Sequence, residues 1–508
     1  MFRAYVRSRA DFLAATWPGR QASVFVIGVA VVHLVAVWCN SGFLNADEHY
    51  QIVEFAQYML GYQPAASLAW EFPAHMRPAL QPWLASLAIR GHQLAGISSP
   101  FAIALSLRLL SSLLATIASF ELCVRCLRPV SSPWARKAGL FLAMFLWIVP
   151  TVHGRFSSEN WGGIWLAAGL CCLLDADDRR QQSRARSIGL AACAGLAWSI
   201  AFYCRFQMAI AIAGAGLWLL VVRRRSAWLI PAIALSFVAG CAANEALNHG
   251  LYNVWTLVPA NYFDQNLVQG NAAQYGVAPW WMTGVYAAII LIPPFSLAVV
   301  GLLVIGSWRA RRHVIVWTAV PFAVVHTMLH RKDARFLIPL LYLLGPWIAL
   351  SLDSLPRRLQ AWFASPWTRA AVTTFCVIDL LLLCIAIVLP ANDHIAMDRW
   401  LWEQGRQGLR VVYTIDRVDT GLPANVTDSF YRSDIVMTPF ASIGRTSAAD
   451  LRTPVFVYYK GTAVPAPLTG IHCAVILRTY PDWLTRLAFF RRLTHIEPAT
   501  ICRLDDLR

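Results

Sequence analysis

The sequence predicts an all-α protein that crosses a membrane about eleven times, with amphipathic helices in an outer loop and a small C-terminal α/β domain. Three observations predict this class. The 508 residues are 58% hydrophobic and only 14% charged, with a mean hydropathy of +0.51, which is far from the composition of a soluble protein. Apolar stretches near the ~20 residues that span a bilayer recur along the chain. Basic residues gather in the short loops between these stretches, as the positive-inside rule describes.

The first apolar stretch sets the orientation. Residues 24–38 follow a basic segment that contains Arg3, Arg7, Arg9 and Arg20, and they lack the small-residue cleavage site of a signal peptide. We therefore expect an uncleaved span that begins in the cytoplasm. The spans are expected at about residues 22–40, 100–122, 138–151, 161–174, 187–203, 207–222, 227–244, 283–306, 314–329, 336–351 and 371–390.

Two segments depart from a simple alternation of spans and short loops. Residues 44–97 are too polar to span a bilayer and too aromatic for a free loop, so they predict amphipathic helices on the outer membrane surface. Residues 330–335 (HRKDAR) form the one arginine-rich loop on the outer side. A basic cluster is unfavourable there for the topology, and it indicates an anionic partner.

Residues 391–508 change character and predict a separate domain on the outer face, after a membrane domain of residues 1–390. Apolar and polar residues alternate in residues 409–415, 454–459 and 474–477, which is typical of strands between Pro/Gly turns. Cys473 and Cys502 would lie in an oxidising compartment, where they either pair or remain two buried thiols. The sequence favours neither outcome.

The net charge of +16 is compatible with nucleic-acid binding only if the basic residues form a patch. They are instead distributed over the loops on one side of the predicted spans, which excludes a nucleic-acid partner and favours membrane lipids. Most cysteines lie in apolar runs and read as small buried residues. Cys123 and Cys126 form a CxxC without a second pair at zinc spacing, so no metal site is expected.

An acidic pair, Asp47 and Glu48, follows the first span directly. Two carboxylates at a membrane exit are unfavourable near hydrocarbon unless they serve a site. A carboxylate can deprotonate an incoming hydroxyl, whereas Lys332 and Arg335 on the same predicted side can neutralise a departing phosphate. Outward carboxylates together with outward cations therefore predict transfer of a group from a phosphate leaving group.

Each of these features has a plainer structural interpretation. The acidic pair could cap the helix that begins near Tyr50, because acidic residues favour a helix N-terminus. Residues 330–335, Arg77 and Arg155 could be headgroup anchors. The triplet Asp175-Ala176-Asp177 looks like the DxD of nucleotide-sugar transferases, but its inward arginine-rich loop favours a solvated turn. Asp379, inside the last span, is expected to pair with a neighbouring helix.

Four motifs resemble those of glycosyltransferase family 22, the polyprenol-phosphate-mannose-dependent α-mannosyltransferases of GPI-anchor and N-glycan assembly. The family motif His-Pro-Asp-Glu corresponds to Asn45-Ala46-Asp47-Glu48 in this chain. Gln51 and Glu54 follow it, much as in family members. Its His-Lys-Glu-x-Arg-Phe reads 331–336 (RKDARF), and its Tyr-Gly-x-x-Pro-Trp reads 275–280 (YGVAPW). Glu71 and Arg77 fall where the family has Trp-Glu-x and then Arg-Ser. The resemblance covers about residues 40–345, and it departs at the missing His-Pro and at Asp333.

The resemblance implies a GT-C fold and an inverting transfer of mannose, or a similar hexose, from a polyprenyl-phosphate donor to a glycan or glycolipid hydroxyl on the extracytoplasmic face. Asp47 would be the general base, and Glu48 would orient the acceptor or share that role. The donor phosphate would be bound by Lys332, Arg335, His330, Arg77 and Arg155. The acceptor or sugar would be bound by His49, Glu71, Glu159, Tyr275 and Trp280. No cofactor or metal ion is required, because cations already hold the phosphate.

Two other functions are compatible with the sequence. A transporter or flippase of lipid-linked sugars would share the cationic groove and the span count, although transporter repeats and mid-membrane charges are not evident. A transferase that moves another sugar to lipid A or to protein would share the chemistry. The compact loops favour a bacterial inner membrane with the site facing the periplasm. A eukaryotic protein would face the ER lumen.

Overall fold

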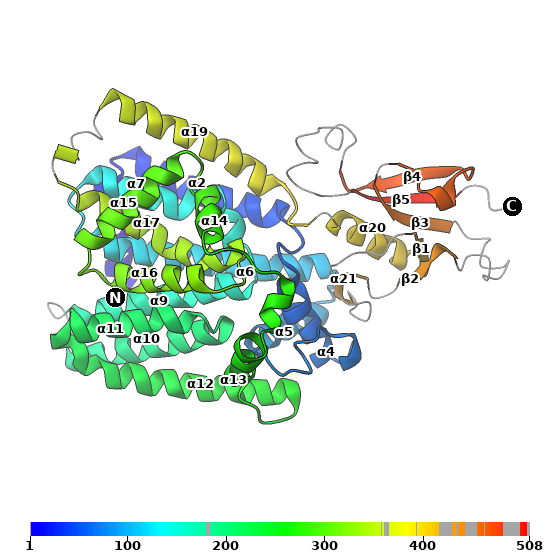
Figure 1. The fold of residues 1–508 in the computed structure, drawn as a ribbon, viewed down its shortest axis with the longest axis horizontal. Coiled ribbons are helices and arrows are strands. Elements are labelled where there is room, and N and C mark those ends of the chain that lie inside the picture. Colours follow the sequence, from blue (N-terminus) through cyan, green and yellow to red (C-terminus); the bar gives the residue numbers. More distant parts are fainter. Residues whose placement is uncertain are drawn as a thin grey trace. The chain divides into compact units, whose positions relative to one another are not determined.

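The computed structural model describes residues 2–178, 183–356, 358–359, 365–392, 394–415, 429–432, 435–441, 455–461, 463–480 and 498–504. The chain divides into two compact units (Figure 1). The first contains Met1–Asn40, Glu71–Leu84 and Ser106–Leu389, and the second contains Ser41–Trp70, Ala85–Leu105 and Pro390–Arg508. One boundary lies at the predicted residue 390. Ser41–Trp70 and Ala85–Leu105 belong to the same unit as the C-terminal region. The predicted division into residues 1–390 and 391–508 does not include this grouping.

The first unit is a bundle of helices, and every predicted span coincides with a helix or a helix pair. The helices of this unit include α1 (Phe2–Thr16), α2 (Arg20–Cys39), α6 (Pro100–Leu127), α7 (Pro133–Phe145), α8 (Val149–His153), α9 (Ser158–Asp177), α10 (Arg184–Cys204), α11 (Met208–Val221), α12 (Ile230–Tyr252), α13 (Val258–Phe263), α14 (Met282–Ile290), α15 (Phe295–Arg309), α16 (Val314–Met328), α17 (Ile338–Asp353) and α19 (Pro366–Val388). Among the described residues, six helical segments are long and apolar enough to cross a membrane: Arg20–Cys39, Pro100–Leu127, Arg184–Cys204, Arg224–Tyr252, Ala334–Asp353 and Pro366–Val388.

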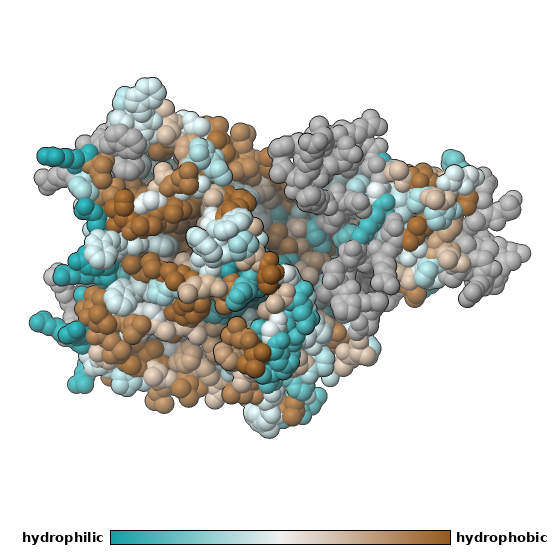
Figure 2. Space-filling view, viewed as in Figure 1, coloured by the Kyte–Doolittle hydropathy of each residue, from teal (hydrophilic) through white to brown (hydrophobic). Residues whose placement is uncertain are grey.

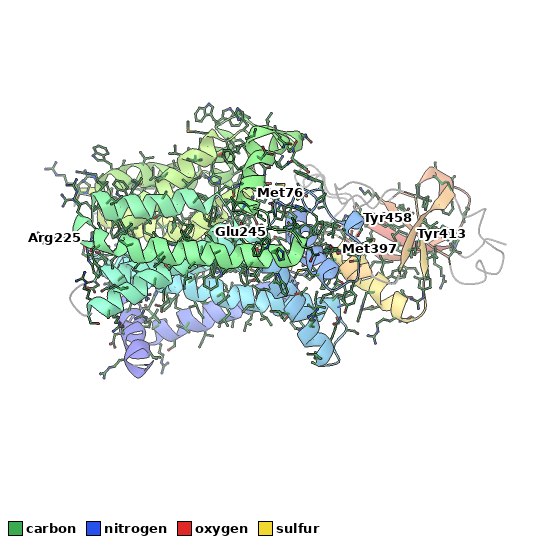
Figure 3. The ribbon with its side chains drawn as sticks, turned by 90° about the horizontal axis from the view of Figure 1, so that it is seen from below. Met76, Arg225, Glu245, Met397, Tyr413 and Tyr458 are labelled. Atoms are coloured by element: carbon green, nitrogen blue, oxygen red, sulfur yellow. A yellow bond between two sulfur atoms is a disulfide. The ribbon has the colours of Figure 1, made fainter. Side chains whose placement is uncertain are left out.

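The flanks of the bundle are apolar, as a lipid-facing surface requires. Figure 2 shows hydrophobic side chains covering the flanks of these helices, and Leu235 and Leu297 are 75% and 77% exposed. Arg225 and Glu245 lie toward opposite ends of the segment that contains α12 (Figure 3). Arg225 and Glu245 are 20 residues apart (245 − 225) in this helical segment, which corresponds to about 30 Å, about the thickness of the hydrocarbon core of a bilayer.

The predicted span at residues 283–306 consists of two helices, which together are apolar enough to form one broken span. α14 ends at Ile290, α15 begins at Phe295, and the two axes are bent by 109°. Pro293 and Pro294 lie in the connection. Because proline lacks an N–H donor and its ring clashes with the preceding turn, the helix cannot continue through this pair.

Glycines allow close helix approach inside the bundle. Gly139 on α7 faces Gly345 on α17, and a Cβ added at Gly139 would lie 2.8 Å from the Gly345 carbonyl oxygen. A Cβ at Gly163 on α9 would lie 2.5 Å from the Tyr342 ring. Small residues at such crossings are the common solution in membrane bundles, where packing rather than the hydrophobic effect holds helices together.

The unexplained acidic residues of the sequence have partners in the bundle. Asp379 accepts the backbone N–H of Trp147 at 2.9 Å, where the chain between α7 and α8 leaves helical geometry. Asp175 accepts two hydrogen bonds from Arg125, at 2.8 and 2.7 Å. Asp177 accepts from Arg223 Nε at 2.7 Å. These ion pairs give the DxD-like triplet a structural role.

The second unit contains short helices and a five-stranded sheet among its described residues. The helices are α3 (Ala46–Glu48), α4 (Glu54–Met59), α5 (Leu80–Leu94, which begins in the first unit), α20 (Ile395–Arg406) and α21 (Ser429–Arg432). The strands are β1 (Val411–Thr414), β2 (Val436–Pro439), β3 (Val455–Lys460), β4 (Cys473–Arg478) and β5 (Ala499–Leu504), in the order β2-β1-β3-β5-β4. β1 pairs in parallel with β2 and β3, and β5 pairs antiparallel with β3 and β4.

The sheet is covered by α20 on one face. Met397 and Leu401 of that helix pack against Val412, Tyr458 and Ile501. A second cluster includes Tyr413 of β1 and Val455, Val457 and Tyr459 at alternate positions of β3. Neighbouring residues of β1 and of β3 therefore belong to different clusters, as expected for the two faces of a strand.

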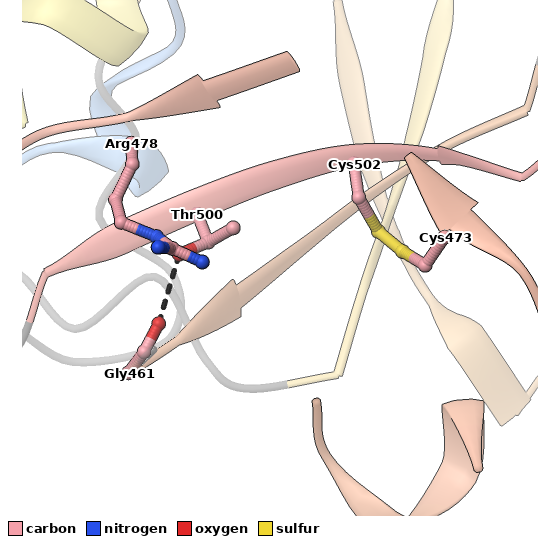
Figure 4. Close-up of a disulfide and its surroundings, with 5 residues drawn as sticks. All are labelled: Gly461, Cys473, Arg478, Thr500 and Cys502. Atoms are coloured by element: carbon pink, nitrogen blue, oxygen red, sulfur yellow. Dashed lines mark hydrogen bonds between the residues drawn. A yellow bond between two sulfur atoms is a disulfide. The ribbon is translucent and has the colours of Figure 1, made fainter. Parts of the chain in front are cut away.

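Cys473 and Cys502 form a disulfide (Figure 4). Their Cα atoms are 5.5 Å apart on neighbouring antiparallel strands. On β5, Thr500 Oγ1 donates to the carbonyl of Gly461 at 2.8 Å. The structure thus selects the paired state, which the sequence left open.

Candidate active site

The acidic pair lies in the single helical turn α3 of the second unit. Asn45 caps this turn, because its Oδ1 accepts the backbone N–H of Asp47 at 3.1 Å. Glu48 Oε2 accepts the N–H of Leu44 at 3.4 Å, which resembles the reciprocal bond of a capping box. Asp47 and Glu48 are half-buried. Since Asn45 supplies the cap, capping alone does not account for the Asp47 carboxylate.

His49, predicted to contact the acceptor, is buried in the same unit. Its ring stacks between Phe43, at a centroid distance of 5.0 Å, and Tyr431, at 5.3 Å. Its Nε2 lies 2.9 Å from Oε1 of Glu54. The structure therefore places His49 in the packing that surrounds the acidic turn.

A second cluster, in the first unit, collects cations around Glu159 at the start of α9. Arg205 Nη1 lies 3.2 Å from Glu159 Oε1, and Arg335 Nε lies 3.7 Å from the same oxygen. Both guanidinium groups also lie over the Phe336 ring, at 5.2 and 5.6 Å from its centroid. Asp333 Oδ2 is 3.1 Å from Arg335 Nε. We call Glu159, Arg205, Asp333, Arg335 and Phe336 the arginine cluster.

The loop that carries Glu159 is fixed by buried hydrogen bonds. Ser157 caps α9 by accepting the N–H of Asn160 at 3.3 Å. The Asn160 amide donates to the carbonyls of His153 and Arg155, at 3.2 and 2.8 Å. Tyr342 donates to the Asn160 side-chain oxygen at 2.5 Å. Glu159 is therefore positioned by α9, its cap and α17.

Arg205 is a site residue that sequence reasoning missed. It follows α10 in a three-residue segment, residues 205–207 (RFQ), and it is 7% exposed. A lone arginine at the outer end of a span is itself a departure from the positive-inside pattern, and this signal could have identified it.

Arg77 lies at one side of the same unit, with its guanidinium 3.4 Å from Glu71 Oε1 and 5.7 Å from the centroid of the Tyr262 ring. Tyr262 accepts a hydrogen bond from Gln207 Nε2 at 2.8 Å. The predicted residues Glu71 and Arg77 are thus brought together, and Tyr262 connects them to the segment that carries Arg205.

Lys332 and Arg155 make backbone contacts. The Lys332 ammonium donates to the carbonyl of Thr327 at 2.9 Å and to that of Leu329, at the C-terminal end of α16. Burial lowers the pKa of Lys332 below its usual value. Arg155 is 1% exposed and donates to the carbonyl of Asn40. These contacts favour a structural role for Lys332 and Arg155, as donors to backbone carbonyls near helix ends. The contact with phosphate that was predicted for both residues is not shown.

The remaining predicted residues are exposed on loops between helices. His330 is exposed, and its carbonyl accepts the N–H of Ala278 at 3.1 Å. Tyr275 and Trp280 are 54% and 71% exposed, so their rings are accessible for stacking on a sugar. Among the described residues, no group of three His, Cys, Asp or Glu side chains could hold a metal ion.

Comparison with known proteins identifies the family. A family model described as the Alg9-like mannosyltransferase family matches residues 23–397. The chain belongs to the Alg9-like mannosyltransferase family. The similar proteins include GPI mannosyltransferase 3 of Yarrowia lipolytica, 25% identical over 70% of this chain and 67% of the relative. They also include Mannosyltransferase APTG1 of Arabidopsis thaliana, 23% identical over 63% of this chain and 56% of that protein.

The fold is shared with a solved structure. ArnT from Cupriavidus metallidurans, bound to undecaprenyl phosphate, has a TM-score of 0.59 at 13% identity, with 95% of this chain and 97% of ArnT covered. This Alg9-like mannosyltransferase is therefore a membrane glycosyltransferase with a GT-C fold. The family and the fold predicted from the sequence are confirmed, and all four motifs lie inside the matched segment.

Proposed function

We propose that this protein transfers mannose from a polyprenyl-phosphate donor to a hydroxyl of a glycan or glycolipid, with inversion at the anomeric carbon. The observation that carries the proposal is the arginine cluster, in which Arg205 and Arg335 converge on one buried carboxylate. Both guanidinium groups lie beside the same Glu159 oxygen, and planar guanidinium groups suit phosphate oxygens. The undecaprenyl phosphate bound to ArnT supports a lipid phosphate as the ligand class.

The chemistry needs one base and one cationic cluster. The acceptor oxygen attacks the anomeric carbon while the bond from that carbon to the phosphate oxygen breaks, and the lipid phosphate departs with the bonding electrons. Asp47 takes the proton of the acceptor hydroxyl. Arg205 and Arg335 stabilise the charge that develops on the phosphate. Glu48 orients the acceptor, and Tyr275 and Trp280 stack on sugar rings.

We further propose that the reaction takes place on the extracytoplasmic face. The alternation of spans predicted from the sequence supports a position for both Asp47 and Arg335 on the side opposite the arginine-rich loops. The Cys473–Cys502 disulfide supports an oxidising compartment for the C-terminal region. A bacterial periplasm and an ER lumen both satisfy this condition.

Replacement of the base tests the proposal. Purified protein is incubated with radiolabelled polyprenyl-phosphate mannose and mixed glycan acceptors, and transfer of label to a glycan is measured. We expect Asp47→Asn to lower turnover about 10²- to 10⁴-fold, while the affinity for the donor stays at the wild-type value. Asp11→Asn, an exposed carboxylate on α1, is the matched control and should transfer normally.

Each outcome decides a different point. Wild-type turnover by Asp47→Asn would overturn the assignment of the base. Label that crosses the membrane without leaving the polyprenyl phosphate would identify a flippase instead of a transferase. Donors that carry other hexoses, tested in the same assay, would identify the sugar.

A further inference from the structure

We propose that Glu54 is the positioning residue of the acidic turn: its buried carboxylate joins that turn to the Ser429–Tyr431 segment of the C-terminal region and so fixes the proposed base. The inference rests on the proposed function, because it takes Asp47 as the base. It assigns the C-terminal region a part in transfer, although the family match ends at residue 397.

The carboxylate of Glu54 is 1% exposed and is surrounded by protein donors. Oε1 lies 2.9 Å from Nε2 of His49 and accepts the N–H of Phe430 at 3.0 Å. Oε2 accepts from Gln63 Nε2 and from Ser429 Oγ, both at 2.6 Å. A carboxylate has about four acceptor positions, so these four groups occupy its capacity. A buried carboxylate is stable only with such a set of donors.

The donors come from distant parts of the chain. His49 and Gln63 belong to the first outer loop, whereas Ser429 and Phe430 lie 375 and 376 residues after Glu54. Figure 1 shows α21 beside α4 within the second unit. The N–H of Phe430 is in the first turn of α21, where a helix lacks internal acceptors. The Glu54 carboxylate thus caps the N-terminus of α21 in the C-terminal region. It also binds His49 and Gln63, which lie near it in the sequence.

The acidic turn is held on both of its flanks. Phe43 precedes Asp47 and Glu48, and His49 follows them, with the two rings stacked at a centroid distance of 5.0 Å and an interplanar angle of 18°. The other face of His49 stacks on Tyr431 at 5.3 Å and 13°. Because Glu54 holds the edge of the imidazole, it restrains the backbone that carries Asp47. A displacement of about 1 Å at a reacting group can lower a rate about 10²-fold.

Glu54 itself is not the base. Its oxygens are occupied by protein donors and it is almost fully buried, so a substrate hydroxyl does not reach it. Its effect on the reaction passes through Asp47. This distinguishes it from Asp47, which is half-buried on the turn.

The test compares turnover per donor-binding molecule in three variants. Equilibrium binding of labelled polyprenyl-phosphate mannose counts the correctly folded molecules, since the proposed donor cations belong to the first unit. We expect Glu54→Gln to lower kcat per bound donor about 10- to 100-fold, with donor Kd changed less than about twofold. Ser429→Ala, which removes one donor, should give a smaller loss of the same kind. Glu403→Gln, an exposed carboxylate on α20 of the same unit, is the control and should be unchanged.

The double variant Asp47→Asn with Glu54→Gln separates positioning from simple destabilisation. If Glu54 acts through Asp47, its replacement has no further effect on the residual rate of Asp47→Asn, because the two residues act as a unit. Multiplied losses, wild-type turnover per bound donor in Glu54→Gln, or a parallel loss of donor affinity would each overturn the inference. Full activity of Asp47→Asn alone would instead overturn the proposed function, so the two failures are distinct.

Discussion

Nη1 of Arg205 lies 3.2 Å from Oε1 of Glu159, and both side chains are more than nine-tenths buried. This ion pair connects the outer end of α10 to the first turn of α9. A buried ion pair is strongly destabilising when only one partner is removed, because the other charge stays desolvated. The pair therefore has a structural consequence that can be measured separately from transfer.

We predict that Arg205→Met destabilises the protein by about 3 kcal/mol and weakens donor binding at least tenfold. Stability falls because the buried Glu159 loses a cationic partner. Donor binding weakens because the phosphate loses a guanidinium contact. Thermal unfolding in detergent and equilibrium donor binding measure the two effects. Arg205→Lys should recover much of the stability and less of the affinity, because an ammonium cannot bind bidentately. Arg311→Met, an exposed arginine on another loop, should change neither, and unaltered donor binding in Arg205→Met would exclude Arg205 from the phosphate site.

Gly345→Leu should prevent normal packing of the bundle. A Cβ at this position would lie 2.8 Å from the Ala143 Cβ on α7, so a larger side chain must separate α7 from α17. Overpacking of this kind destabilises by about 1 to 3 kcal/mol or more. A lower midpoint of thermal unfolding is expected. Gly216→Leu on α11, where an added Cβ meets nothing within 4 Å, is the matched control and should unfold near the wild-type temperature.

The buried ammonium of Lys332 predicts a particular pH dependence of stability. Burial lowers its pKa in the folded protein below 10.5, the value expected in the unfolded chain. Between these two values the unfolded state binds more protons, so the free energy of unfolding rises with pH relative to a variant without the group. Thermal unfolding of wild type and Lys332→Met should therefore diverge in favour of the wild type as pH approaches 10.5. Parallel profiles would contradict the assigned burial.

The Cys473–Cys502 disulfide should stabilise the C-terminal sheet by about 3 kcal/mol, given its separation of 29 residues. The double replacement Cys473→Ala with Cys502→Ala is expected to lower the unfolding temperature of that region and to increase its proteolysis. Cys193→Ala, which removes an exposed free cysteine of α10, serves as the control. Equal proteolysis of the two variants would show that the bridge adds little.

Much of the fold follows from the sequence, because spans and loops differ strongly in hydropathy. Each predicted span coincides with a helix or a helix pair, and the strands of residues 411–414, 455–460 and 473–478 coincide with predicted alternation. The break before Phe295 was not predicted, although the proline pair that causes it is visible in the sequence. β2 and β5 were also missed, because strands of four and six residues with weak alternation gain their stability from neighbours in the sheet.

The site was predicted less completely, for a physical reason. Asp47, Glu159 and Arg335 were proposed as site residues from charge at a predicted membrane face, and these assignments remain predictions. Arg205 and Glu54 act through partners that are distant in sequence, so no local pattern indicates their role. Lys332 and Arg155 were assigned to phosphate by charge alone, whereas the carbonyls they contact depend on where helix ends meet in space.

The strand order β2-β1-β3-β5-β4 has a consequence for the order in which the protein is made. Among the described strands, β4 pairs only with β5, which is synthesised later. During synthesis β4 therefore has an open edge, and Cys473 has no bonded sulfur until Cys502 has left the ribosome. A nascent chain halted before residue 499 would therefore carry β4 without its neighbour.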